Sequence, residues 1–295
     1  MKALVISGGG SKGAFAGGVA QYLLENKKKD YDLFIGTSTG SLLISHLALN
    51  EMEELHRIYT NVNQKTIFNI RPFKIKKKNN FTTVSINHKN TIKNFFRGSK
   101  TFGESKNLKK LINKEITDNL LQRIRDSKKE VIVTVSNLSL NRVEYKALSD
   151  NSFDDFRDWI WGSSNYAPFM SILEKNHCEY ADGGFANLMP IEEAIKRGAT
   201  EVDAIILETE LTQLNRMPSK NPFSLMINIF EFMQENIGKH NVSLGKLAAK
   251  HHNVKLNLYY TPTVLTTNSL IFDKEKMTRW WKQGFDHAKR KDEKN

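Results

Sequence analysis

The seven residues Phe34–Gly40 have the types and spacing of a nucleophilic site. They read Phe-Ile-Gly-Thr-Ser-Thr-Gly, a G-x-S-x-G pattern that follows an apolar run and leads into another. Between a strand and a helix this pattern predicts a sharp turn that exposes the hydroxyl of Ser38 in front of a helix N-terminus. We expect Gly36 and Gly40 where strand and helix pass too closely for a side chain. Alone, the pattern also fits an ordinary turn, so two further stretches are needed.

A glycine loop, Gly8-Gly9-Gly10-Ser11-Lys12-Gly13, follows the first predicted strand. Adjacent glycines between a strand and a helix can offer bare backbone N–H groups to an anion. In an acyl-transfer enzyme that anion is the tetrahedral oxyanion, and the loss of one such donor costs on the order of 3 kcal/mol. We expect Lys12 either to add positive potential or to pair with an acid.

The same loop matches the G-x-G-x-x-G pattern of dinucleotide-binding folds through its first, third and last glycines. That function requires an acid at the far end of the second strand, to hold a ribose. Asp30 and Asp32 stand before this strand, and the Ser38 turn occupies its end. A phosphate loop of the G-x-x-x-x-G-K-[ST] type fails as well, because Lys12 is followed by glycine. Binding of an oxyanion is the use that remains.

A serine nucleophile needs a base. Asp182 ends a predicted strand and is followed by Gly183 and Gly184, which allow a sharp turn and a close approach of another segment. None of the eight histidines lies in a context that marks it as a base. Two hypotheses stay open: Asp182 itself is the base, or a triad includes a later histidine such as His252 or His287.

The elements that would position these residues alternate along the chain. Predicted strands cover Lys2–Ser7, Asp32–Ile35, Val131–Val135, Arg142–Leu148, Glu179–Asp182, Val202–Leu207 and Val254–Tyr260. Predicted helices cover Ala14–Glu25, Thr39–Leu49, Glu51–Tyr59, Leu108–Ile124, Ser152–Trp161, Pro190–Gly198, Phe223–Ile237 and Lys274–Lys289. This alternation predicts an α/β layered domain with a mixed or largely parallel sheet. No linker is visible, so we expect one domain over residues 1–295. The apolar helix Phe223–Ile237 fits a core helix, a pocket wall or a dimer face, and of these we expect the core.

The segment 65–114 is strongly basic. It holds 14 Lys or Arg and one acid, Glu104, so its net charge is +13. The net charge of the whole chain is +12. Its part at about 64–105 lacks regular periodicity and interleaves phenylalanines with lysines, so we interpret it as an insertion or lid. Such a surface favours an anionic partner, either phospholipid headgroups or nucleic acid, although a Lys-rich solvated surface is the plainer alternative.

Composition sets further limits. No apolar run reaches the roughly 18 residues of a membrane span, and the short N-terminal apolar run lacks the features of a signal peptide. Cys178 is the only cysteine, so no intrachain disulfide can form. These features predict a cytoplasmic protein.

The three motifs, in this order and in these contexts, resemble those of the patatin-like phospholipases. The segment Ser163–Pro168 is similar to the family's small-residue segment before the acid, and Asn187 and Pro190 are similar to its extended acid motif, with the asparagine one position early. The stretch Gly284–Ala288 is similar to the family's closing helix. The resemblance thus covers nearly the whole chain, and it is loosest over Gln64–Ser105.

The resemblance implies a Ser–Asp dyad without histidine. Ser38 would be the nucleophile and Asp182 the base, and Gly8, Gly9 and Gly10 would form the oxyanion hole. Lys12 stands where the family has Arg or Lys, and the other motif glycines would support the site (Gly13, Gly36, Gly40, Gly183 and Gly184). The implied fold is a three-layer α/β/α sandwich around a mixed, largely parallel sheet.

The implied reaction is hydrolysis of a fatty acyl ester of a phospholipid or lysophospholipid through an acyl-enzyme, with no metal or cofactor and no need for calcium. Segment 65–114 would then make a peripheral contact with anionic membrane, where each lysine contributes up to about 1 kcal/mol. Acyl transfer to an acceptor other than water would use the same residues. A nucleic-acid-binding protein is the weaker alternative, since the chain has no zinc pattern, helix-turn-helix signature or basic stripe on a regular helix. A binding module without catalysis is disfavoured by the intact motifs.

Overall fold

The computed structural model describes residues 1–78, 81–211, 219 and 221–293. Its centre is an eight-stranded sheet with the order β10-β9-β1-β2-β5-β8-β7, in which β6 pairs with β5. The strands from β10 to β5 are parallel, whereas at one edge the pairings of β6 with β5, of β8 with β5 and of β7 with β8 are antiparallel. The expected mixed, largely parallel sheet is therefore confirmed. The strand bounds are β1 Lys2–Ile6, β2 Leu33–Thr37, β5 Glu130–Asn137, β6 Arg142–Ala147, β7 Leu173–Lys175, β8 Cys178–Asp182, β9 Glu201–Ile206 and β10 Lys255–Tyr260.

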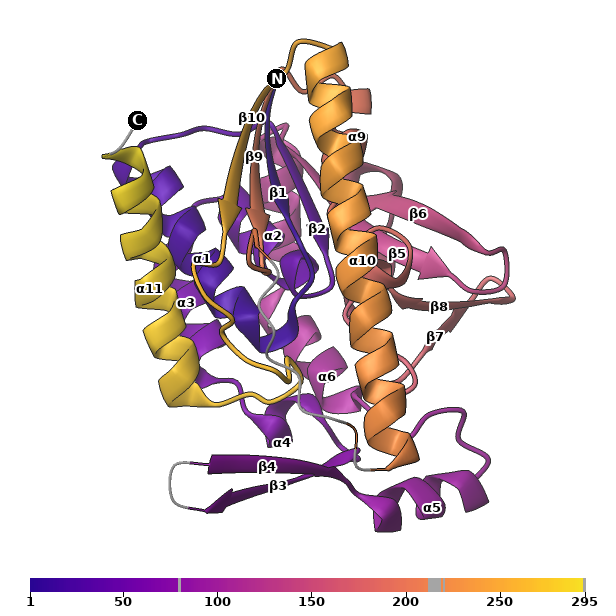
Figure 1. The fold of residues 1–295 in the computed structure, drawn as a ribbon. Helices are drawn as coiled ribbons and strands as arrows, with labels where there is room; N and C mark the ends of the chain where they lie inside the picture. The colour runs from indigo at the N-terminus through magenta and orange to yellow at the C-terminus, as the bar shows by residue number, and fades with distance from the viewer. Residues whose placement is uncertain (79–80, 212–218, 220, 294–295) are drawn as a thin grey trace.

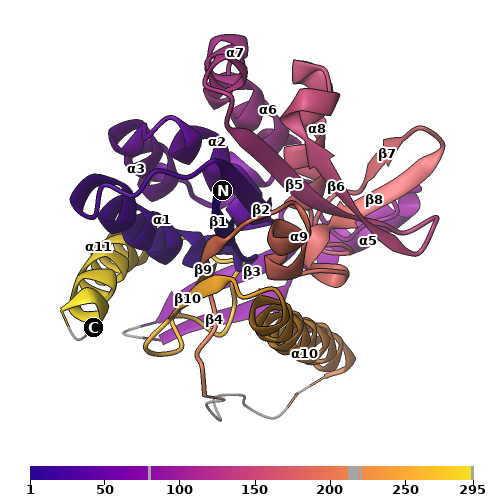
Figure 2. The same cartoon turned by 90° about the horizontal axis from the view of Figure 1, so that it is seen from above.

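Helices cover both faces of this sheet, which makes three layers (Figures 1 and 2). Alternate side chains of β1 and β2 face opposite layers, because successive side chains of a strand point to opposite faces. Leu4 and Phe34 belong to the core cluster on the side of α1, α2, α3 and α11, whereas Val5 and Ile35 belong to the cluster on the side of α9 and α10. Burial on both faces explains why these strands are continuous apolar runs.

The helices occupy the expected places along the chain, with three differences described below. Their bounds are α1 Gly13–Gln21, α2 Thr39–Ala48, α3 Met52–Asn61, α4 Gln64–Ile67, α5 His88–Phe96, α6 Lys106–Glu115, α7 Asp118–Asp126, α8 Phe153–Ser163, α9 Ile191–Lys196, α10 Pro222–His251 and α11 Lys274–Asp292. A π-helical turn, Tyr22–Asn26, continues α1. None of the helices in the described ranges is long and apolar enough to span a membrane.

The expected single helix Leu108–Ile124 is wrong. The segment forms two helices, α6 and α7, with a break at Ile116 and Thr117. Thr117 is extended, and its hydroxyl accepts a hydrogen bond from the amide of Leu120 at 3.2 Å, so it caps α7. The Thr-Asp pair is a helix-start signal that the continuous apolar spacing hides.

The prediction for Phe223–Ile237 is wrong in its length and in its placement. The helix, α10, continues to His251. It lies on the outside of the molecule (Figure 1), so only one stripe, including Met226 and Phe230, packs against the core. Four other apolar residues in its N-terminal half are about half exposed or more: Leu225, Ile229, Phe232 and Met233.

The segment expected to be irregular, 64–105, contains regular structure. It forms α4, an antiparallel hairpin of β3 (Phe73–Lys78) and β4 (Phe81–Ile86), and α5. Phe68 and Phe73 are buried, which anchors the segment, whereas Phe95 and Phe96 on α5 are 77% and 83% exposed. The hairpin and α5 lie below the carboxyl ends of the parallel strands in Figure 1.

Candidate active site

Ser38 lies at the turn between β2 and α2 with a strained backbone. Its φ of 53° and ψ of −119° fall in a region that side chains other than glycine rarely adopt. The neighbouring glycines allow the turn to close. A Cβ added to Gly36 would lie 2.4 Å from the carbonyl carbon of Gly40, and one added to Gly40 would lie 2.3 Å from the carbonyl oxygen of Ile6. The expected close passage of strand and helix is confirmed.

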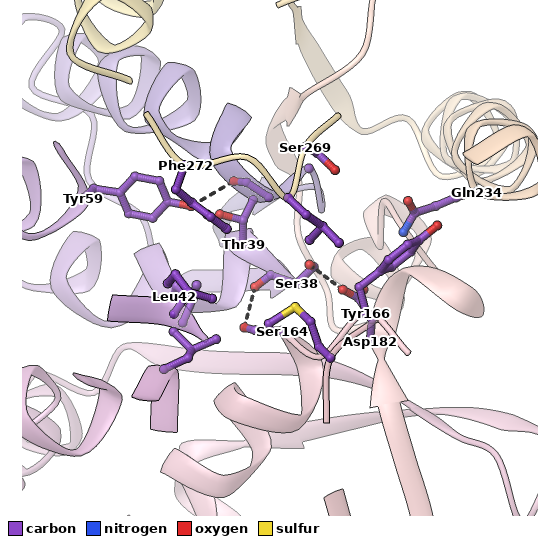
Figure 3. A pocket seen from close by; sticks show the side chains of 16 residues that line it. Ser38, Thr39, Leu42, Tyr59, Ser164, Tyr166, Asp182, Gln234, Ser269 and Phe272 are labelled. Atoms are coloured by element: carbon purple, nitrogen blue, oxygen red, sulfur yellow. Dashed lines mark hydrogen bonds between the residues drawn. The ribbon is translucent and has the colours of Figure 1, made fainter. Parts of the chain in front are cut away.

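Asp182 ends β8 and faces the serine. The Ser38 hydroxyl donates a hydrogen bond to Oδ2 of Asp182 at 2.6 Å (Figure 3). The amide of Gly184 donates to Oδ1 at 2.8 Å, and the amide of Asp182 donates to the carbonyl of Asn165 at 2.9 Å. Gly183 is required here because a Cβ would lie 2.2 Å from the carbonyl oxygen of Thr134. The carboxylate is thus held from both sides in one orientation toward the serine.

The surroundings of Asp182 make it a better base than an exposed carboxylate. Its exposure is only 2%. Burial raises the pKa of Asp182 to about 7, while the hydrogen bonds from Ser38 and Gly184 lower that pKa in part. A general base is most effective when its pKa lies near the working pH. The carboxylate can therefore exchange a proton with the serine near neutral pH.

The glycine loop lies beside these two side chains. Gly9 and Gly10 line the same pocket as Ser38 and Asp182. Within the described part of the chain, the amides of Gly9 and Gly10 donate to no protein acceptor. The amide of Gly8 differs, since it donates to the carbonyl of Leu188 in a long bond of 3.4 Å. Of the three glycines predicted for an oxyanion hole, two have available donors.

Several contacts hold this loop in place. Lys12 is buried and pairs with Glu208, so the expectation that it pairs with an acid is confirmed. The Tyr59 hydroxyl donates to the carbonyl of Gly10 at 3.1 Å, and the Ser11 amide donates to the carbonyl of Ser269 at 2.8 Å. Gly13 packs against Tyr59, which leaves no room for a Cβ there.

The serines at the end of α8 support the Ser38 turn. The amide of Ser38 donates to the hydroxyl of Ser163 at 2.9 Å, and the Ser164 hydroxyl donates to the carbonyl of Ser38 at 3.3 Å. The Ser41 hydroxyl donates to the same carbonyl at 2.6 Å. The small-residue segment therefore satisfies the backbone of the nucleophile, a role that its composition alone does not reveal.

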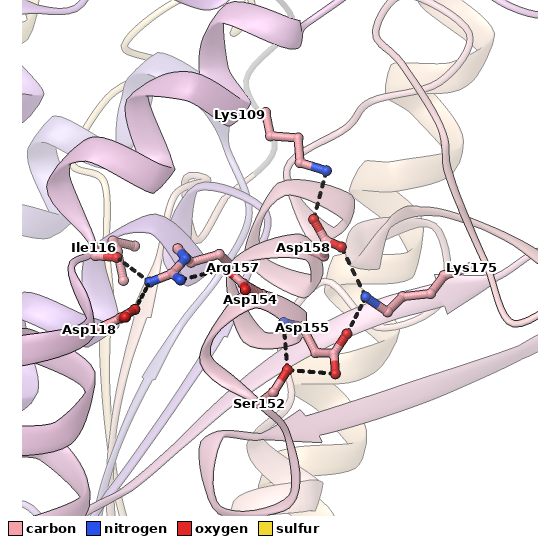
Figure 4. Close-up of polar contacts among 9 residues, drawn as sticks. All are labelled: Lys109, Ile116, Asp118, Ser152, Asp154, Asp155, Arg157, Asp158 and Lys175. Carbon is pink, nitrogen blue, oxygen red and sulfur yellow. Dashed lines mark hydrogen bonds and ion pairs between the residues drawn. The ribbon is translucent and has the colours of Figure 1, made fainter.

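A polar network fixes α8 on its neighbours (Figure 4). The Arg157 guanidinium donates to the carbonyl of Ile116 at 3.1 Å and to the carboxylate of Asp118 at 2.7 Å. Asp158 pairs with Lys109 at 2.7 Å and with Lys175 at 2.9 Å. These contacts tie α8 to α6, α7 and β7, and thereby fix the position of the serines at its end.

The rest of the pocket comes from residues that the sequence analysis did not single out. They include Met170, Ser269 and Phe272. Tyr166 and Gln234, which also line the pocket, lie in stretches that were singled out for other reasons (Figure 3). These residues come from separate segments that only the folded chain brings together. No local pattern in the sequence marks them.

The two histidines considered for a triad lie elsewhere. His252 is exposed at the C-terminal end of α10, and the ring of His287 packs on Phe15 with 5.7 Å between centroids. Among the described residues, neither histidine bonds to Ser38 or Asp182. The geometry brings the serine to the aspartate alone.

Comparison with known proteins places the chain in a family. The sequence model of the family described as patatin-like phospholipase matches residues 4–195, a range that contains the glycine loop, Ser38 and Asp182. This chain belongs to the patatin-like phospholipase family. The description of this family names a phospholipase, that is, a hydrolase of lipid esters.

A solved structure is similar in fold. The chain matches the crystal structure of VipD from Legionella pneumophila with a TM-score of 0.55 and 16% sequence identity. The match covers 98% of this chain and 66% of that one, so this chain spans slightly less than two thirds of VipD. No curated protein matches the chain in sequence. The expected patatin-like three-layer α/β/α fold is confirmed.

Proposed function

We propose that this patatin-like protein hydrolyses fatty acyl esters of phospholipids or lysophospholipids, with Ser38 as nucleophile and Asp182 as base. The observation that carries this proposal is the 2.6 Å hydrogen bond from Ser38 to a buried carboxylate whose pKa is raised to about 7. A serine alone is a weak nucleophile and needs such a partner.

The reaction follows from the positions of these two side chains. Oγ of Ser38 attacks the ester carbonyl carbon while Oδ2 of Asp182 accepts the serine proton. The tetrahedral intermediate then collapses, the bond to the leaving alcohol breaks, and the alcohol takes the proton back from Asp182. A water molecule, deprotonated by the same carboxylate, attacks the acyl-enzyme and releases the fatty acid. The proton returns to Ser38, so Asp182 ends each cycle ionised.

Gly9 and Gly10 are suited to stabilise the oxyanion in both steps. Their amides line the pocket beside Ser38 and have no protein acceptor among the described residues. The N-terminus of α2 lies directly behind the serine, and its partial positive charge favours the same negative charge. Removal of one preorganised donor typically lowers kcat by about 10²–10³-fold.

The basic segment 65–114 supplies a contact with anionic membrane in this proposal. Lys89, Lys93 and Arg97 are exposed on α5 next to the exposed rings of Phe95 and Phe96. Basic residues attract anionic headgroups, and apolar rings insert at the interface. The carboxyl ends of the parallel strands, where Ser38 lies, face this end of the molecule (Figure 1).

The test is fatty-acid release from mixed phospholipid vesicles, with EDTA present, by the parent protein and by Ser38→Ala and Asp182→Asn. Both variants should lose release by at least about 10³-fold if the two residues act as a unit. Matched controls are Ser149→Ala and Asp150→Asn, exposed residues of the short helix after β6, which should retain parental rates.

Each outcome separates the hypotheses. Release by Asp182→Asn at the parental rate would remove Asp182 from its role as base. Acyl transfer would appear as an acyl ester of an added alcohol in place of free fatty acid. Absence of release by all folded proteins, the parent included, would contradict hydrolysis of these lipids.

A further inference from the structure

A second, largely apolar pocket adjoins the active-site pocket. It shares Leu42, Tyr59, Ile67, Leu108 and Phe272 with the pocket that contains Ser38. Its further walls come from α2, α3 and α6 and are mostly apolar and buried: Leu55, Ile58, Val62, Leu111, Ile112 and Ile116. An apolar ligand group attached at Ser38 would find continuous apolar walls here.

The direction of this pocket follows α2. Ser38 caps this helix, and Leu42 and His46 follow at intervals of four residues, so the three lie along one face. All three line one or both of the pockets. At 1.5 Å per residue, the distance along the helix from Ser38 to His46 is about 12 Å.

The region of His46 is polar, unlike the rest of the pocket. His46 is only 3% exposed, and within the described ranges its Nδ1 atom has no hydrogen-bond partner. Glu115 lines the pocket beside it, and its carboxylate pairs with Arg57 at 2.9 Å. The Nδ1 atom is already buried, so the cost to a longer methylene chain lies in the charged pair: a chain that extended past His46 would have to cover Glu115 and Arg57, which is unfavourable.

We propose that this second pocket binds the fatty acyl chain of the substrate and that His46 and Glu115 limit its length to about ten carbons. The inference rests on the proposed function for its orientation, with the acyl carbonyl at Ser38. An extended chain advances about 1.25 Å per carbon for C–C bonds of about 1.5 Å, so 12 Å accommodates roughly nine or ten carbons.

The first test measures kcat/KM for a series of p-nitrophenyl esters with acyl chains of 4 to 16 carbons. The parent should peak near 8–10 carbons and fall at least fivefold by 16. His46→Ala should move the peak about three carbons longer, and Leu42→Phe, which narrows the pocket one turn from Ser38, should move it shorter. His56→Ala is the matched control, because His56 sits on α3 against Trp281 and lines neither pocket. A parental profile that rises steadily to 16 carbons would overturn the proposal.

The second test does not require catalysis. Isothermal titration of saturated fatty acids of 6 to 16 carbons into Ser38→Ala should show affinity rising about fourfold per carbon and levelling near ten. In the double variant Ser38→Ala/His46→Ala, affinity should continue to rise to a longer chain length before it levels. If affinity levelled near ten carbons but the parent protein had no esterase activity, the acyl-chain pocket would stand and the proposed hydrolase function would be rejected. Affinity that rises equally to 16 carbons in both variants would reject the length limit.

Discussion

The hydroxyl of Ser163 accepts a hydrogen bond from the backbone amide of Ser38 at 2.9 Å, although the two residues are 125 positions apart in the sequence. This bond satisfies a buried amide of a residue held at φ 53°. Strained backbone of this kind persists only when its surroundings fix it. Ser163 is therefore a positioning residue for the nucleophile.

We predict that Ser163→Ala lowers the free energy of unfolding by about 1–3 kcal/mol, because it leaves the Ser38 amide buried without an acceptor. Turnover should fall with little change in KM. Urea unfolding and acyl-release kinetics check both effects. Ser164→Ala is the matched control: the carbonyl of Ser38 that Ser164 contacts also accepts from the amide and hydroxyl of Ser41. Equal losses in the two variants would contradict a specific role for Ser163.

The raised pKa of Asp182 predicts opposite effects of pH on stability and activity. The pKa is about 7 in the folded protein and near 3.9 in the unfolded chain. The folded state therefore holds the proton of Asp182 more tightly than the unfolded chain does. The contribution of this proton to the free energy of unfolding is complete below pH 4 and is lost as pH rises through 7. Activity, which requires the ionised base, should increase over the same range with an apparent pKa near 7.

Asp182→Asn provides the comparison, since asparagine stays neutral. The difference in unfolding free energy between variant and parent should grow from pH 4 to pH 7 in favour of the variant, by up to about 4 kcal/mol, and then level. Chemical denaturation at several pH values measures it. Parallel stability curves for the two proteins would show that burial does not raise this pKa.

Much of the site could be predicted because its signals are local. The strand–turn–helix around Ser38 requires Gly36 and Gly40 at close approaches, and those requirements are visible as a short pattern. Asp182 was marked by the glycines that let it turn. The positions of the buried strands along the chain followed from their apolar composition, since helices cover both faces of the sheet.

The remaining parts depend on tertiary packing. Gln234 reaches the pocket because α10 packs against the turn at Gly183 and Gly184, and no spacing in the sequence encodes that packing. The outer face of α10 is apolar and exposed, so periodicity suggested a core helix where only one stripe is covered. Continuous apolar spacing hid the break between α6 and α7 at Ile116. The many lysines of β3 hid the hairpin that it forms with β4.

The pair of Lys12 and Glu208 predicts a role in holding the glycine loop. Lys12 is buried and lies two residues after Gly10 in the same loop. Lys12→Met should lower kcat about tenfold or more with a small change in KM, because displaced amides weaken only interactions made in the transition state. Steady-state kinetics of this variant, of Glu208→Gln and of the double variant measure the coupling between the two residues. Lys100→Met, which breaks an exposed pair with Glu174, should be neutral. If the effects of Lys12→Met and Glu208→Gln on kcat were independent and additive, the pair would have no role in holding the glycine loop.

The exposed rings of Phe95 and Phe96 predict how the protein meets its substrate surface. Insertion of one such ring into an apolar environment contributes about 1.5–3 kcal/mol, so Phe95→Ala/Phe96→Ala should weaken binding to anionic vesicles by at least tenfold. Sedimentation with vesicles of phosphatidylcholine and 30% phosphatidylserine, at about 0.1 M and 0.5 M salt, checks this effect and the screening of the lysine contribution. The matched control is Leu138→Ala/Leu140→Ala, two exposed apolar residues between β5 and β6, far from α5 in the chain. Unchanged binding by the α5 variant, or an equal loss in the control, would rule out α5 as the membrane contact.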